Sequence, residues 1–282
     1  MLEIHLLKPL NVEQQRVLIS YLNASHTLTR AEWTIIWDVM DVLRTAIVTV
    51  GEKRYTFAEF YRVNIDDVYA NSFLDALWNA EQPEFVGRQL KISTSRAIRR
   101  LFRTQSWYIP AKKESRWLFA YCVYWWNSFA NGYIFEVSVL RDLQKEGIVF
   151  SERDIRNPAE RFTSADILIE EWAGDMKNST YFFFVARSYP LICDFYITRL
   201  FNVERRRYDW IVILNKRMWV KIDGETKASD FHHLDECLEN PLHFELSSNI
   251  FIAVSYLVWK QKLLRYQQGG TTDGKENIRG NE

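Results

Sequence analysis

Two stretches near the middle of the chain decide the fold: GYIFEVSVLRDLQKEGIVF at residues 132–150 and TSADILIEEWAGDMKNS at residues 163–179. The first repeats apolar residues at helical spacing and ends at a glycine, which predicts a helix followed by a short strand at Ile148–Phe150. The second alternates apolar and polar residues, which predicts strands at Asp166–Glu171 and Gly174–Asn178. A helix followed by consecutive strands indicates a domain of mixed α and β structure.

Two acids and one lysine fall at corresponding places on these predicted strands. Because alternate residues of a strand point to the same face, Asp175 and Lys177 lie side by side, while Met176 points to the opposite face with its carbonyl still available. Asp166 opens the preceding strand. Carboxylate and carbonyl oxygens suit Mg²⁺, and a nearby lysine can stabilise charge on a phosphodiester. We therefore expect a Mg²⁺ site, with Mn²⁺ as a substitute, formed by the two aspartates and Met176.

The order of these features resembles the PD-(D/E)xK nuclease superfamily, which includes restriction enzymes, Holliday-junction resolvases and transposon-associated endonucleases. The resemblance covers about residues 132–222 and rests on four positions in chain order: Glu136 within a helix, Asp166 at the start of a strand, and Asp175 and Lys177 on the next. It implies that both aspartates bind metal and that Lys177 acts on the attacking water or the transition state. It also implies that Glu136 assists the metal or the water, in a Mg²⁺-dependent endonuclease acting on DNA.

Several alternatives for these positions stay open at this point. The hairpin through residues 171–173 must be tight, and a shift of the strand boundaries would let Glu170 or Glu171 replace Asp166 or Asp175. The five residues that begin with Asp175 are also typical of a polar turn between two strands. The helix glutamate could be an ordinary solvated residue.

The first 130 residues are expected to be mainly helical. Asn11 and Thr29 are residue types that cap helices, and each precedes a run with apolar residues at three- and four-residue spacing. The second of these runs extends over Ala31–Val50. Further apolar faces follow at Tyr55–Phe60 and Val68–Trp78.

A strongly basic segment lies within this half of the chain, between Arg88 and Arg116. Four of its arginines share one helical face: Arg96, Arg99, Arg100 and Arg103. Like charges at this spacing cost some helix stability, so we expect an anionic partner. DNA phosphates would fit, because arginines on such a face position a duplex without reading its sequence. The alternative is a solvated basic face that pairs with acids elsewhere.

Further elements are predicted after residue 180. Strands are expected at Tyr208–Leu214 and Met218–Ile222, and a terminal helix over Phe244–Tyr266. The segment Tyr181–Phe201 is compatible with a helix followed by a strand or with two strands around Pro190.

The sequence therefore predicts an α+β protein. A helical region with a basic face occupies residues 1–130, and a restriction-endonuclease-like α/β domain with a mixed central sheet occupies residues 131–268. Residues 269–282 are rich in Gly, Thr, Asn and charged residues and are predicted to be a disordered tail.

Composition excludes several other classes of protein. With 282 residues of which 48% are hydrophobic, the chain can bury a sizeable core, and its 36 basic and 36 acidic residues balance. Its three cysteines lack zinc-site spacing and favour a reducing cytoplasm. We expect no export signal, and Arg187, Pro190 and Asp194 interrupt the most apolar late stretch, so we expect no membrane span.

Two rival functions remain open beside the nuclease. The first is a non-catalytic nucleic-acid-binding or assembly protein that keeps the nuclease-like fold. The second is a protein-interaction module whose 11 tryptophans form a partner surface. The expected partner of the nuclease is DNA, in a homodimer or a larger nucleoprotein assembly.

Overall fold

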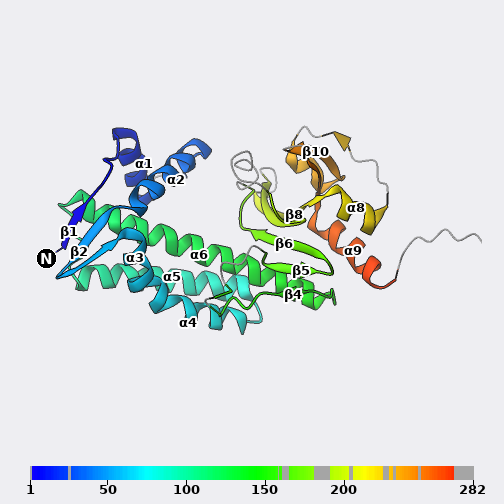
Figure 1. Cartoon of the computed structure of the whole chain (residues 1–282), viewed down its shortest axis with the longest axis horizontal. Coiled ribbons are helices and arrows are strands. Elements are labelled where there is room, and N and C mark those ends of the chain that lie inside the picture. Colours follow the sequence, from blue (N-terminus) through cyan, green and yellow to red (C-terminus); the bar gives the residue numbers. More distant parts are fainter. Residues whose placement is uncertain are drawn as a thin grey trace, which may run out of the picture. The chain divides into compact units, whose positions relative to one another are not determined.

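The structure is a computed structural model that divides into two compact units, Met1–Ile134 and Phe135–Glu282 (Figure 1). The described residues are 2–24, 27–157, 159–160, 165–180, 191–202, 206–224, 229–230, 233–246 and 249–269. Both helices and sheets are present, so the predicted α+β class is confirmed. In the part of the chain that is described, no helix is long and apolar enough to cross a membrane.

Helices make up most of the first unit, as predicted. They are α1 (Val12–Asn23), α2 (Arg30–Arg44), α3 (Phe57–Tyr61), a π-helical turn (Arg62–Asp66), α4 (Asp67–Trp78), α5 (Pro83–Thr104) and the first part of α6 (Lys113–Lys145). Asn11 and Thr29 cap α1 and α2, and each forms a reciprocal capping box with the residue three positions later. Helix ends closed in this way leave fewer backbone N–H groups without a partner.

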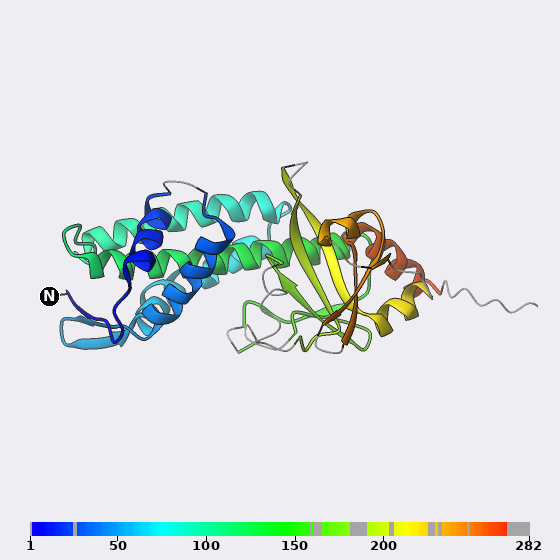
Figure 2. The same ribbon diagram turned by 90° about the horizontal axis from the view of Figure 1, so that it is seen from above.

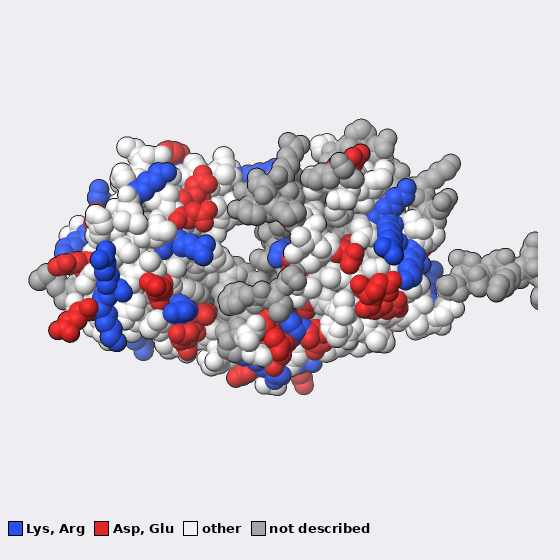
Figure 3. Space-filling model, viewed as in Figure 1, with Lys and Arg blue, Asp and Glu red and all other residues white. Residues whose placement is uncertain are grey.

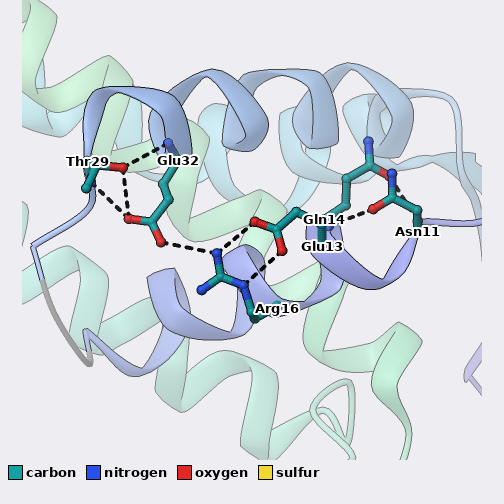
Figure 4. Close-up of polar contacts among 6 residues, drawn as sticks. All are labelled: Asn11, Glu13, Gln14, Arg16, Thr29 and Glu32. Atoms are coloured by element: carbon teal, nitrogen blue, oxygen red, sulfur yellow. Dashed lines mark hydrogen bonds and ion pairs between the residues drawn. The ribbon is translucent and has the colours of Figure 1, made fainter.

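The cap of α2 belongs to a polar network that extends to α1, and the Asn11–Gln14 cap of α1 lies beside this network (Figure 4). The Arg16 guanidinium on α1 lies 2.7 Å from a carboxylate oxygen of Glu13 and 3.5 Å from one of Glu32 on α2. Glu32 is also the residue that accepts the backbone N–H of Thr29, at 3.0 Å. The network therefore ties α1 to the beginning of α2.

The first unit also contains a small sheet that the sequence analysis missed. It has the order β1 (Leu2–His5), β2 (Ile47–Val50) and β3 (Lys53–Thr56), with both pairs antiparallel. The predicted helix over Ala31–Val50 is therefore wrong at its end, because α2 stops at Arg44. The β-branched residues of β2 favour a strand, and Gly51, at a φ of 61°, turns the chain into β3.

The longest helix, α6, does not begin at Gly132 as its apolar pattern indicated. It runs without interruption from Lys113 to Lys145, and the division between the two units falls within it. Helical spacing of buried aromatic residues such as Trp126 continues into the segment that carries Glu136. A single glycine costs a helix only about 1 kcal/mol, which packing on both sides can offset.

The second unit is built on a mixed sheet, as predicted. Its described strands have the order β4-β5-β6-β7-β8-β11-β10-β9. The bounds are β4 (Ser151–Glu152), β5 (Ile167–Ile169), β6 (Trp172–Lys177), β7 (Phe195–Asn202), β8 (Arg207–Asn215), β9 (Ser229–Asp230), β10 (Leu242–Leu246) and β11 (Asn249–Ser255). The β6–β7 and β9–β10 pairs are parallel and the other pairs are antiparallel. The strand predicted at Ile148–Phe150 begins instead at Ser151.

The helices of the second unit differ from the prediction, first at Met218–Ile222. A short 3₁₀ helix spans Leu234–Leu238, and α8 (Lys216–Asp223) and α9 (Tyr256–Gln267) pack against β8 and β11 (Figure 2). The strand predicted at Met218–Ile222 lies in α8, because Asn215 caps a helix there, its side chain accepting the Met218 N–H at 2.7 Å.

Only the last part of the segment Phe244–Tyr266, which was predicted to be one helix, is helical. Its first residues belong to β10 and β11, where Ile250, Ile252 and Val254 alternate with other residues and favour a strand. In the ambiguous segment Tyr181–Phe201, the residues from Phe195 onward belong to strand β7, and residues 181–190 lie outside the described residues. The predicted tail also lies outside them from residue 270 onward.

The pairing of β6 with β7 depends on a glycine. Gly174 lies opposite Phe195, and a Cβ atom added at Gly174 would lie 2.1 Å from Cζ of that ring. Phe195 is fully buried and its ring lies 5.7 Å from that of Trp259 on α9. Because the ring is fully buried and also contacts Trp259, an added methyl group would overpack this site.

We expect Gly174→Ala to lower the free energy of unfolding by about 1–3 kcal/mol, because it overpacks a filled site. Gly132→Ala in α6 is the control: apart from its chain neighbours and the adjoining backbone of its own helix, no described atom lies within 4 Å of its added Cβ. This variant should be neutral or stabilising by up to about 1 kcal/mol. Urea denaturation followed by circular dichroism measures both. Equal stability of the two variants would contradict close packing at Gly174.

Candidate active site

Strand pairing places Arg153, Asp166 and Asp175 in one row across β4, β5 and β6. The registers of the two strand pairs, continued by one residue, set Arg153 opposite Asp166 and Asp166 opposite Asp175. The Arg153 N–H donates to the carbonyl of Asp166 at 3.4 Å, as this register requires, and the Asp166 N–H donates to the carbonyl of Gly174, the neighbour of Asp175, at 2.9 Å. The Asp166 and Asp175 side chains are also joined by a hydrogen bond. Residues directly opposite have Cβ atoms about 5 Å apart, so the three side chains meet.

Lys177 extends the row along β6. Its Nζ lies 2.6 Å from Oδ2 of Asp175, so the two side chains share one face, as the alternation predicts. Met176 between them is buried on the opposite face, and its backbone N–H donates to Oδ2 of Asp166 at 2.7 Å. Because all three residues belong to β6, the alternative of a polar turn beginning at Asp175 is wrong.

Glu136 reaches the same row from α6. The residue is only 4% exposed, so the alternative of a solvated helix position is wrong. Its carboxylate accepts hydrogen bonds from Nη2 of Arg153 at 3.0 Å and from Nε at 3.3 Å. The same Nη2 lies 2.5 Å from Oδ1 of Asp166, so Arg153 bridges the two acids.

The resulting acidic cluster, defined as Glu136, Arg153, Asp166, Asp175 and Lys177, holds three acids against two bases. Burial raises the pKa of Asp166 to about 8, and the negative charges of Glu136 and Asp175 act in the same direction. Burial also raises the pKa of Glu136, although Arg153 opposes this effect. With every group ionised the cluster has one excess negative charge, which either a proton or an added cation can neutralise.

Arg153 is the member of the acidic cluster that the sequence analysis missed. It lies in the stretch SERDIRNPAERF, which has no periodic pattern to indicate an inward-pointing side chain. The available signal was indirect, because a glutamate on the apolar side of a helix needs a cationic partner. That requirement does not identify which arginine provides it.

Glu170 and Glu171, the two acids that a shifted register would have used, do not join the acidic cluster. They form the two-residue connection of the β5–β6 hairpin, one position earlier than predicted, and Glu170 has a φ of 53°. Glu170 accepts a hydrogen bond from the Tyr266 hydroxyl at 3.2 Å, and Glu171 pairs with Lys221. Both glutamates therefore form polar contacts at the protein surface, outside the acidic cluster.

The donor groups of the acidic cluster fit a hard divalent cation. Among the described residues, no three or more His, Cys, Asp or Glu side chains are grouped so as to hold a metal ion. Two carboxylates and a backbone carbonyl are a smaller set, which suits Mg²⁺ because that ion keeps several of its waters. In such a set Asp166 and Asp175 would supply the carboxylates and Met176 the carbonyl, and the excess negative charge of the acidic cluster would favour a cation.

The predicted basic face lies on α5 in the first unit. All four of its arginines, 96, 99, 100 and 103, are exposed, and within the described part of the chain none of them pairs with an acid. The molecular face drawn in Figure 3 shows acidic and basic side chains interspersed, in line with the zero net charge. Because basic and acidic residues balance over the chain, the four arginines form a local basic face.

No protein-family model, curated protein or solved structure matches this chain. The functional argument therefore depends on the acidic cluster and on the chemistry of its side chains.

Replacing Arg153 with methionine should lower the free energy of unfolding by about 3–5 kcal/mol, because it leaves the buried Glu136 without its partner. Arg156→Met, which removes an exposed arginine paired with Asp154, should change stability by less than about 0.5 kcal/mol. Chemical denaturation of both variants gives the comparison.

Adding Glu136→Gln to Arg153→Met should recover part of the loss, since the unpaired charge is then absent. A parent-like stability of the Arg153→Met single variant would contradict the bridging role.

Proposed function

We propose that this protein is a Mg²⁺-dependent endonuclease that hydrolyses phosphodiester bonds of DNA. The observation that carries the proposal is the meeting of Asp166, Asp175 and Lys177 on one face of two adjacent strands. Lys177 is 43% exposed in its side chain, so a substrate can reach it, whereas the two aspartates are mostly buried. Two acids and an amine in this arrangement suit phosphodiester hydrolysis.

Asp166, Asp175 and the Met176 carbonyl would hold Mg²⁺, with Mn²⁺ as a substitute. The bound ion would neutralise charge on the phosphodiester and lower the pKa of a water molecule. The supporting evidence in the chain is the excess of acid over base in the acidic cluster and the raised pKa of Asp166.

The remaining residues of the acidic cluster have separate roles in this proposal. The Lys177 ammonium donates hydrogen bonds to the attacking water or to phosphate oxygens, where negative charge increases during the reaction. Glu136 is a positioning residue, because it holds the Arg153 guanidinium, and Arg153 in turn contacts Asp166. The arginines of α5 contact DNA phosphates without reading sequence.

One observation favours a second candidate, a non-catalytic nucleic-acid-binding or assembly protein. Arg153 already pairs with Glu136 and Asp166, and Lys177 already pairs with Asp175. Internal ion pairs of this kind can hold a sheet edge together without any chemistry. This candidate predicts DNA binding that depends on salt but not on a divalent cation.

The nuclease proposal places the protein in the cytoplasm with DNA as its partner, in a homodimer or a larger nucleoprotein assembly. The three cysteines are free thiols, which suits a reducing compartment.

Purified protein should nick or cut supercoiled plasmid DNA with Mg²⁺ and not with EDTA. Lys177→Ala should slow cleavage by about 10²–10³-fold, since it removes one group that stabilises the transition state. DNA affinity, measured by fluorescence anisotropy with Ca²⁺, should stay within about twofold, because phosphate contacts elsewhere supply most of the affinity.

Lys221→Ala is the matched control for this test, because Lys221 is a similarly exposed lysine of the same unit that pairs with Glu171. It should cleave as the parent does. Unchanged cleavage by Lys177→Ala would reject the assignment, and binding without any cleavage by the parent would favour the non-catalytic candidate.

Mg²⁺ should stabilise the parent protein. At ten times its dissociation constant, an ion bound only to the native state adds about 1.4 kcal/mol, or about 3–6 °C in Tm. Asp175→Asn should lose this shift, because it removes one of two ligand carboxylates. Asp235→Asn, which changes an exposed acid of the 3₁₀ helix, should keep it. Differential scanning fluorimetry measures the shifts, and equal shifts in both variants would place the ion elsewhere.

A further inference from the structure

A cavity of about 190 Å³ in the first unit is lined by cationic side chains. Its polar and aromatic lining comes from α1, α5, the connection that follows α5, and α6: Asn23, Arg99, Arg103, Tyr108, Arg116 and Phe119. Two aliphatic side chains of α1 complete the wall. Every lining residue precedes residue 135, so the cavity belongs to the first unit alone.

Local structure explains why three arginines meet at this cavity. Arg99 and Arg103 are four residues apart on α5, so they lie on the same side of that helix. Arg116 is brought to them by the connection between α5 and α6, which Ser115 holds in place. The Ser115 hydroxyl donates to the Trp107 carbonyl at 2.8 Å and accepts the N–H of Ile109 at 2.6 Å.

The positive charge of this cavity is not neutralised by its own walls. None of the described residues that line it is acidic, and Nε of Arg116 is buried without a hydrogen-bond partner. Arg99 lies 5.8 Å from the centre of the Phe119 ring, which orients its guanidinium without neutralising it. By contrast, Arg16 on the α1 wall helix pairs with both Glu13 and Glu32 (Figure 4). A buried donor without a partner beside a cationic cavity points to an anionic ligand.

We propose that this cavity binds the phosphate group of a phosphomonoester. Guanidinium groups present paired N–H donors that match phosphate oxygens, and a dianion balances several cations better than a carboxylate does. The volume exceeds the roughly 150 Å³ that accommodates a benzene-sized molecule, so the phosphate and a small adjoining group fit. Arg96 and Arg100, the other two arginines of the basic face, do not line the cavity, so the site uses only part of that face together with Arg116. The proposal does not depend on nuclease activity.

The phosphomonoester could belong to a free nucleotide or to the 5′-phosphate end of a nucleic-acid strand. Isothermal titration of the full chain, with EDTA present to keep divalent cations from the acidic cluster, tests both sources. The probes are inorganic phosphate, a 5′-mononucleotide and its nucleoside, and one single-stranded oligonucleotide carrying either a 5′-phosphate or a 5′-hydroxyl.

We expect phosphate and the mononucleotide to bind with one-to-one stoichiometry and the nucleoside not to bind. If the strand end is the source, the 5′-phosphate oligonucleotide should bind at least about tenfold more tightly than the 5′-hydroxyl form. Equal affinity of the two oligonucleotides, with tight binding of the mononucleotide, identifies the free nucleotide as the ligand. Failure of every phosphorylated probe to bind would overturn the proposal.

Arg116→Met should weaken phosphate binding by about tenfold or more, because it removes a charge-assisted donor. Arg103→Met is a second variant from a different helix, in case the first fails to fold, and circular dichroism checks both. Arg54→Met, which changes an exposed arginine of β3, should bind phosphate as the parent does. Parent-like affinity of both cavity variants would overturn the proposal.

Discussion

The register of β5 against β6 is the constraint on which the acidic cluster depends. The two-residue connection at Glu170 and Glu171 sets Ile169 opposite Trp172, and that pairing in turn brings Asp166 beside Asp175. A slip of one residue would send Asp175 and Lys177 to the face that packs against α9. Gly174 opposes such a slip, because it is the residue that leaves room for the Phe195 ring.

Charge balance links the two candidate functions of this cluster. In the described part of the chain, Arg153 and Lys177 are the bases that pair with the three carboxyl groups, and burial together with the neighbouring negative charges raises the pKa of Asp166. The excess negative charge destabilises the acidic cluster when no ion is bound, and the same charge attracts a divalent cation. The contacts within the acidic cluster are therefore the same for a nuclease and for a non-catalytic protein. The two candidates differ in what neutralises the excess negative charge: a divalent cation in the nuclease, and a proton in the non-catalytic protein.

Local patterns in the sequence predicted some elements well and others poorly. Asn11 and Thr29 were recognisable as caps because capping depends on residues only three apart. Short apolar runs were misassigned: Ile47–Val50 was included in a helix, and Met218–Ile222 was taken for a strand. Periodicity over so few residues does not separate helix from strand, and pairing with distant strands decides the outcome.

The sequence by itself determined that the protein is α+β and that Asp175 and Lys177 share a face, because the alternation of a strand is a local property. Only the tertiary structure decided that Arg153 bridges Glu136 and Asp166, and that Arg116 joins two arginines of α5 around a cavity. These groups come from separate elements. Strand register and the course of a connecting loop bring them together, and neither can be predicted from a local pattern of residues.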